Sequence, residues 1–147
     1  DDPAIETVFT GDTFGLVYPP LQKFGRFALP STSPTNFDAA LAKESVARVL
    51  ALGERFVAPT HFDAWTDAGA IAGQLVRFLD RAGRWVEDAA KTGDSFEVLS
   101  KALSAKWRAA ILEEAPRFNE RELEFLSLDM ELNGQGLAVA AAARRQA

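Results

Sequence analysis

The stretch Ala4-Ile5-Glu6-Thr7-Val8-Phe9-Thr10-Gly11-Asp12-Thr13 decides how the first part of this chain folds. Residues 4–10 are rich in β-branched and aromatic side chains, and typical turn residues stand on both sides of them. The pattern predicts a strand over residues 4–10 that ends at a Gly-Asp turn. A second short strand is predicted over residues 55–59, and it leads directly into Thr60-His61-Phe62-Asp63.

Helical spacing of apolar residues follows each predicted strand. A helix is predicted from about residue 38 to Gly53, and another begins at Asp67 with a regular apolar face: Ile71, Leu75, Phe78, Leu79, Ala82 and Val86. Residues 12–37 form a long loop whose aromatic side chains are expected to pack onto the rest of the chain. The order strand, loop, helix, strand, helix predicts an α/β fold.

The sequence pattern changes after Gly93, because only helical spacing of apolar residues follows and no strand pattern does. One helix is capped by Asp94 or Ser95 and ends at Pro116, and its apolar face consists of Phe96, Leu99, Leu103, Trp107 and Ile111. Asn119 and Glu122 have the spacing of a capping box for a last helix with Leu123, Leu126, Leu128 and Leu132. Asn133-Gly134-Gln135-Gly136 is a candidate break in that helix. We therefore divide the chain into an α/β part, 1–92, and a helical extension, 93–147.

Composition excludes several classes of protein. The 147 residues are 48% apolar and 25% charged, which suits one globular domain and excludes disordered and fibrous chains. The net charge of −5 gives no basic surface for nucleic acid, and no apolar run approaches the roughly 20 residues of a membrane span. Cysteine is absent, which excludes disulfides, thiolate catalysis and cysteine metal sites. We expect a soluble, cytoplasmic protein with a small-molecule substrate.

The start of the chain is unusual. It opens with Asp1-Asp2-Pro3, and its single methionine is Met130. We expect that an upstream portion is missing, and removal of a signal peptide is the simplest explanation from composition alone.

Asp12 and His61 are the candidate site residues. Neither residue indicates a functional site by itself, because aspartate is common in turns and a lone histidine usually has a structural role. Both, however, follow predicted strands, where α/β folds collect their sites, and carboxylate and imidazole are ligands for zinc or iron. A catalytic zinc site typically uses three protein ligands, and this chain has one histidine and no cysteine. Either no metal is bound, or further ligands come from polypeptide outside this chain.

Other motifs favour structural roles. Ser/His/Asp catalysis would need His61, but a Gly-x-Ser-x-Gly elbow is absent. Gly134 and Gly136 follow no strand, so they do not form a dinucleotide loop. The tryptophans at 65, 85 and 107 are predicted to pack in the core, with a pocket mouth as the alternative for Trp65. The charged residues between 117 and 124 are interpreted as a solvent-exposed helix face.

Four segments resemble the metallo-β-lactamase superfamily. Residues 7–15 (TVFTGDTFG) and 59–62 (PTHF) are similar to its last two metal-binding motifs. Residues 30–38 (PSTSPTNFD) and 129–138 (DMELNGQGLA) are similar to segments of a bacterial branch labelled only as metallo-hydrolases. The resemblance covers essentially the whole chain.

The resemblance implies a fold and a metal centre. Asp12 would bridge two metal ions and His61 would bind one of them, with zinc expected and iron or manganese as alternatives. The family's earlier His-x-His-x-Asp-His cluster has no counterpart here. The chain would therefore be the C-terminal half of a four-layer α/β/β/α sandwich with a helical appendix, completed by the N-terminal portion of the same protein as a separate or cleaved chain.

Two functions remain open at this stage. The first is a metal-dependent hydrolase acting on an acyl ester, thioester or lactone, active only with the N-terminal portion. The second is a non-catalytic interaction or scaffold module in which the C-terminal helices make an oligomer contact such as a homodimer. If half of the fold is missing, the isolated chain should expose a sheet edge and fold poorly.

Overall fold

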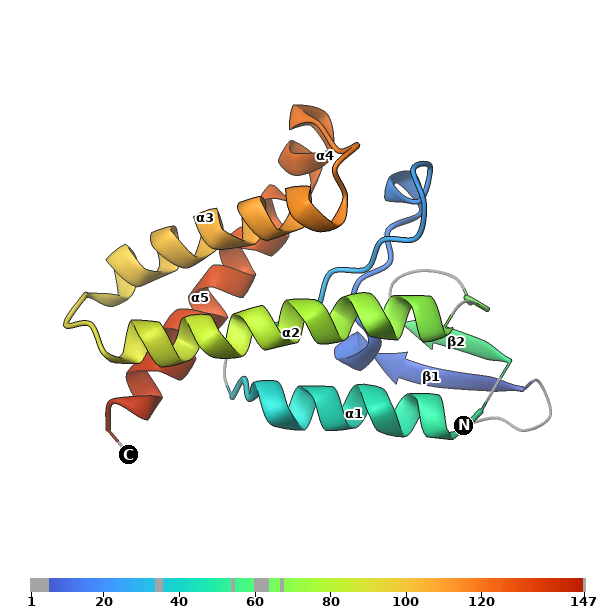
Figure 1. Cartoon of the computed structure of the whole chain (residues 1–147), viewed down its shortest axis with the longest axis horizontal. Coiled ribbons are helices and arrows are strands. Elements are labelled where there is room, and N and C mark those ends of the chain that lie inside the picture. The colour runs from blue at the N-terminus through green and yellow to red at the C-terminus, as the bar shows by residue number, and fades with distance from the viewer. Residues whose placement is uncertain (1–5, 34–35, 54, 60–63, 67, 147) are drawn as a thin grey trace. The chain divides into compact units, whose positions relative to one another are not determined.

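The computed structural model describes residues 6–33, 36–53, 55–59, 64–66 and 68–146, and most of them are helical (Figure 1). The first part contains β1 (Thr7–Gly11), the 3-10 turns η1 (Asp12–Phe14) and η2 (Pro19–Leu21), α1 (Ala39–Ala51) and β2 (Phe56–Pro59). The remaining elements are α2 (Ala68–Ala90), α3 (Phe96–Glu114), α4 (Glu120–Phe125) and α5 (Ser127–Arg144). The strand predicted over 55–59 and the helices predicted before Pro116 are confirmed within a few residues at their ends, and the strand predicted over 4–10 is confirmed from Thr7, since residues 4 and 5 lie outside the described residues. The single helix predicted after Asn119 is instead two helices, α4 and α5, which are separated at Leu126. None of the described helices is long and apolar enough to cross a membrane.

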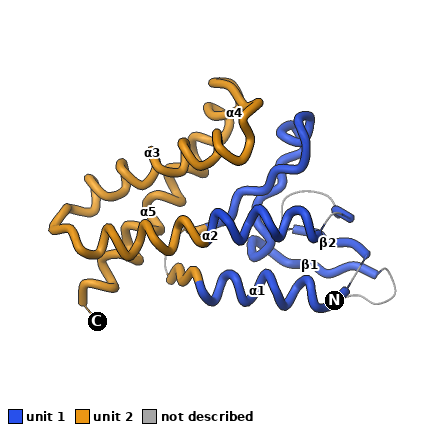
Figure 2. The backbone as a smooth tube through the Cα atoms, viewed as in Figure 1, with its two compact units in different colours: residues 1–31, 40–79 blue, residues 32–39, 80–147 orange. Residues whose placement is uncertain are grey.

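The chain forms two compact units (Figure 2). Unit 1 consists of Asp1–Ser31 and Ala40–Leu79, and unit 2 consists of Thr32–Ala39 and Asp80–Ala147. The long helix α2 contributes its first half to unit 1 and its second half to unit 2. The boundary predicted at residue 92 stays a prediction.

Unit 1 contains a parallel two-stranded sheet. Val8 pairs with Val57, and Gly11 pairs with Pro59 at the carboxyl end of both strands. The connection between the strands contains α1, as parallel pairing requires a crossover. Val8 and Val57 on one face of the sheet are buried, whereas on the other face Thr7 is buried and Phe9 is exposed.

The core of unit 1 lies between the long loop and the first half of α2. Phe14 and Phe27 of the loop are buried, which confirms that its aromatic residues pack. Phe27 meets Phe78 of α2 edge to face, with ring centroids 6.3 Å apart. The backbone N–H of Ala28 donates to the side-chain oxygen of Gln74 at 2.7 Å. The loop is therefore packed into the core of unit 1 by apolar contacts and by a buried hydrogen bond.

In unit 2, α3 packs against α5 with very little space between their backbones. A Cβ atom added at Gly134 of α5 would lie 2.7 Å from the Ser100 carbonyl oxygen and 2.8 Å from the Ser104 nitrogen. The predicted break at 133–136 is wrong, since α5 runs unbroken from Ser127 to Arg144. The glycines are needed for close packing, and the burial of the helix compensates for their low helix propensity.

Segment 32–39 is fixed to α5 by one buried pair of residues. The backbone N–H of Thr32 donates to Oδ1 of Asn133 at 2.7 Å, and the Thr32 hydroxyl donates to the Asn133 carbonyl oxygen at 3.1 Å. Thr32 and Asn133 are both buried. The structure therefore joins two residues that are about 100 positions apart in the sequence.

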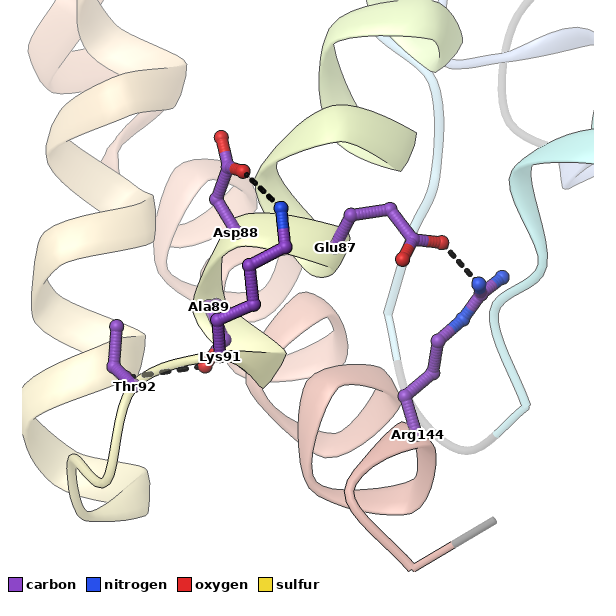
Figure 3. A network of polar contacts seen from close by, with 6 residues as sticks. All are labelled: Glu87, Asp88, Ala89, Lys91, Thr92 and Arg144. Carbon is purple, nitrogen blue, oxygen red and sulfur yellow. Dashed lines mark hydrogen bonds and ion pairs between the residues drawn. The ribbon is translucent and has the colours of Figure 1, made fainter.

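The end of α5 is tied to the end of α2 by charged side chains (Figure 3). Arg144 forms an ion pair with Glu87. Arg145 donates to the carbonyl oxygens of Ala89, at 2.9 Å, and Asp94, at 3.0 Å. Arg145 therefore supplies donors to one carbonyl group in the last turn of α2, that of Ala89, and to one in the connection that follows the helix, that of Asp94.

The predicted fold class is wrong for the described residues. Half of a four-layer α/β/β/α sandwich would need further strands, but the described residues form only one sheet of two strands. After Pro59 the apolar residues follow helical spacing, as in α2, whose apolar face is buried. These helices bury their apolar faces mainly on other helices and loops, so no second sheet layer is formed in this part of the chain.

Candidate functional site

The predicted site residues follow the two paired strands. Asp12 comes directly after Gly11, and Gly11 pairs with Pro59, the last residue of β2. Because β1 and β2 are parallel, both strands end at the same edge of the sheet (Figure 1). His61 is two residues beyond Pro59 and lies outside the described residues. The structure therefore brings together the strand ends from which the two predicted ligands come.

The turn that carries Asp12 is fixed on both sides. Gly11 and Gly15 have φ values of 56° and 79°, which favour glycine, and the Gly15 N–H donates to the Asp12 carbonyl oxygen at 3.0 Å. Phe14 is fully buried between them. A Cβ at Gly15 would lie 2.7 Å from Cδ2 of Leu75 and 2.9 Å from the Leu29 carbonyl oxygen. The buried side of the turn is anchored, while Asp12 itself is exposed at the sheet edge.

The described residues on either side of His61 are paired with each other. Val57 and Trp65 exchange two backbone hydrogen bonds, of 2.9 Å and 2.8 Å. The chain therefore leaves β2 at Pro59 and is again paired with this strand at Trp65.

The ring of Trp65 contacts the cationic side chain of Arg26. The guanidinium carbon of Arg26 lies 4.6 Å from the centroid of the Trp65 ring, a cation–π distance. The loop before Arg26 is held by Gln22, whose side chain binds the backbone N–H and carbonyl of Phe27 at 3.0 Å and 2.8 Å. Sequence reasoning missed Arg26, because the loop has no periodicity that would place it beside Trp65. The other two tryptophans, which were predicted to have packing roles, meet edge to face with ring centroids 5.3 Å apart; Trp107 is fully buried and Trp85 is half-buried.

The fit of these residues to a metal ion is partial. Carboxylate and imidazole are suitable donors for zinc. Among the residues that the structure describes, however, no three His, Cys, Asp or Glu side chains form a group that could hold an ion. A complete site would need His61 and further ligands in addition to Asp12.

Comparisons of the chain with protein-family models, curated proteins and solved structures found no match.

Proposed function

We propose that this chain supplies Asp12 and His61 as ligands of the metal centre of a hydrolase. The observation that supports this proposal is the pairing of Gly11 with Pro59 in a parallel sheet. This register makes the Gly-Asp and Thr-His motifs follow neighbouring strands at one sheet edge. The remaining ligands would come from the N-terminal portion of the same protein, so this chain alone would be inactive.

The chemistry of the two side chains suits this role. A carboxylate has two oxygens and can contact two cations, whereas a neutral imidazole offers one nitrogen and needs an acceptor for its other N–H. When bound, a pair of zinc, iron or manganese ions would supply hydroxide at neutral pH. Asp12 would hold the ions at the sheet edge, because the buried Phe14 and the close contacts of Gly15 fix its turn. We propose an acyl ester, thioester or lactone substrate, and a cytoplasmic location for the assembled enzyme.

Metal content tests the proposal directly. The chain is assembled with its N-terminal portion, and bound metal is measured by mass spectrometry after titration with a chelator. We expect Asp12→Ala and His61→Ala each to weaken metal binding by more than the roughly 10- to 100-fold loss that follows removal of an outer-sphere partner. Hydrolysis of acyl esters should be lost together with the metal.

Asp88→Ala is the matched control for this experiment. Asp88 is an exposed aspartate of α2 whose side chain pairs with Lys91 at 3.1 Å, and it belongs to unit 2, whereas Asp12 belongs to unit 1. Its removal should leave metal content unchanged. Unaltered metal content in both Asp12→Ala and His61→Ala would refute the proposal.

A second candidate function is an interaction module built on the C-terminal helices. Leu123 and Leu126 are buried within unit 2, so they are not available for a contact. Leu128 and Leu132 of α5 are 63% and 38% exposed, and these leucines favour a contact with another molecule.

A further inference from the structure

The loop that carries Arg26 starts and ends beside the turn of Asp12. Leu16 follows this turn and exchanges two backbone hydrogen bonds with Leu29, of 2.8 Å and 3.1 Å. Arg26 comes three residues before Leu29, so its Cα atom lies at most about 11 Å from that pair. The loop, the turn and both strands belong to unit 1. Arg26 is therefore held in the part of unit 1 that carries the first predicted ligand.

Trp65 is joined to the same sheet edge through β2. It pairs with Val57, which comes two residues before Pro59, and Pro59 pairs with Gly11. Two residues of a strand span about 7 Å, so the pair of Val57 and Trp65 stands only a short distance back from the strand ends. A substrate whose reacting group is held at the sheet edge would extend over a distance of this order.

The position of Arg26 is fixed by residues around it. Its guanidinium carbon lies 4.6 Å from the centroid of the half-buried Trp65 ring, while Arg26 itself is exposed. Gln22 binds the backbone N–H and carbonyl of Phe27, the next residue, and also donates to the Tyr18 carbonyl oxygen at 3.0 Å. A guanidinium that contacts an aromatic ring keeps a fork of N–H donors in its own plane. Arg26 is thus already ordered before any ligand binds, which lowers the entropy cost of binding.

The charge of the loop indicates which chemical group it would bind. Residues 13–37 contain two basic residues, Lys23 and Arg26, and no acidic residue, although the whole chain has a net charge of −5. The ammonium of Lys23 lies 4.8 Å from the centroid of the Phe24 ring in the same loop. The paired N–H donors of arginine match two oxygens of a carboxylate or a phosphate. The loop therefore favours an oxyanion.

We propose that Arg26 binds an oxyanion at the far end of the hydrolase substrate. The substrate is then an acyl compound that carries a carboxylate or a phosphate at a distance from the bond that is cleaved. Trp65 is a positioning residue, because it acts by holding the guanidinium. This proposal rests on the proposed function, since Asp12 marks the place of the reacting group.

The first experiment measures hydrolysis of three nitrophenyl esters by the chain assembled with its N-terminal portion. The acyl chains have equal length and end in a methyl, a carboxylate or a phosphate group. One of the anionic esters should have the lowest KM, which distinguishes carboxylate from phosphate. Arg26→Gln should raise this KM about 10-fold or more, because a charged hydrogen-bonded pair is lost, and should leave kcat and the methyl ester unchanged. Arg26→Lys keeps the charge without the fork of donors, so its KM should lie between the two.

Arg55→Gln is the matched control. Arg55 is also exposed, and its guanidinium carbon lies 5.1 Å from the centroid of the Phe56 ring. It directly precedes Phe56, the first residue of β2, and so stands at the opposite end of this strand from Pro59. Its replacement should leave the KM of all three esters unchanged. Circular dichroism should show native helix content for every variant.

The second experiment measures binding without chemistry. In the matching ketones a methylene group replaces the ester oxygen, so no bond can be hydrolysed. Calorimetry should show that the anionic ketone binds more tightly than the methyl ketone. Arg26→Gln should weaken the anionic ketone by about 10-fold or more and leave the methyl ketone unchanged. A merely structural role of Arg26 would affect both ketones alike.

The outcomes separate the oxyanion site from the hydrolase. Metal-dependent hydrolysis without preference for an anionic ester, or a preference that Arg26→Gln retains, overturns the oxyanion site and leaves the hydrolase standing. Absence of bound metal and of hydrolysis of all three esters overturns the hydrolase. In that case, Arg26-dependent binding of an anionic ketone supports the oxyanion site as a ligand site, whereas equal binding of the ketones overturns it as well.

Discussion

Gly136 of α5 occupies a position where only a hydrogen atom fits. A Cβ there would overlap the carbonyl oxygen of Thr32 and lie 2.7 Å from its carbonyl carbon. Both are backbone atoms, so relief requires movement of the chain. We predict that Gly136→Ala lowers the free energy of unfolding by about 1–3 kcal/mol, measured by urea denaturation.

A second glycine provides the control for this prediction. Gly73 is inside α2, and a Cβ there would make only an ordinary contact, 3.6 Å from Nη1 of Arg77. Gly73→Ala should therefore stabilise the protein by about 0.5–1 kcal/mol, because alanine is the better helix former. A stabilising Gly136→Ala would show that α5 and segment 32–39 are not in contact in solution.

At the scale of elements, α4 depends on its capping box. The helix has six residues, too few to be stable by itself. The Arg121 N–H donates to Oδ1 of Asn119 at 2.9 Å, and the Asn119 N–H donates to Oε2 of Glu122 at 3.0 Å. The capping box is confirmed, whereas the interpretation of 117–124 as a solvent-exposed face is wrong for Glu122, which is buried.

We predict that Asn119→Ala costs about 1 kcal/mol of unfolding free energy, since the variant loses the acceptor for the Arg121 N–H, although its own backbone N–H can still donate to Glu122. Ser95 caps α3 through a single bond of 3.4 Å from the Val98 N–H, and α3 is much longer. Ser95→Ala should therefore cost less than Asn119→Ala in the same denaturation experiment. Equal losses would contradict the view that the capping box holds α4 in place.

At the scale of the whole molecule, the two units should differ in local stability. Unit 1 contains a sheet of two strands, which is marginal without further packing, while unit 2 is formed by helices that bury Trp107, Leu103 and Ile111. We predict that the amides of β1 and β2 exchange with deuterium faster than those of α3 and α5. Equal protection, with one cooperative thermal transition of a monomer, would contradict both this prediction and the expectation that the isolated chain folds poorly.

The candidate site could be located from the sequence only as far as its strand ends. Gly11 directly follows one predicted strand and Pro59 ends the other, and local residue types are sufficient to place these positions. The pairing of Gly11 with Pro59 joins residues that are distant in the sequence, and no local pattern indicates the pairing of Val57 with Trp65. The contact of Arg26 with Trp65 has no sequence signal, because it depends on how a loop without periodicity is folded.

The sequence by itself determined the elements of this protein, because strand, helix and cap signals act over a few residues. It predicted the strands, the helices and the Asn119 cap. Only the tertiary structure decided how many strands form a sheet, that Gly134 and Gly136 serve close packing instead of a helix break, and that Phe96 stays exposed. Each of these features depends on which surfaces of the elements come into contact. Apolar periodicity predicts that one face of an element is buried, but it does not show which other element covers that face.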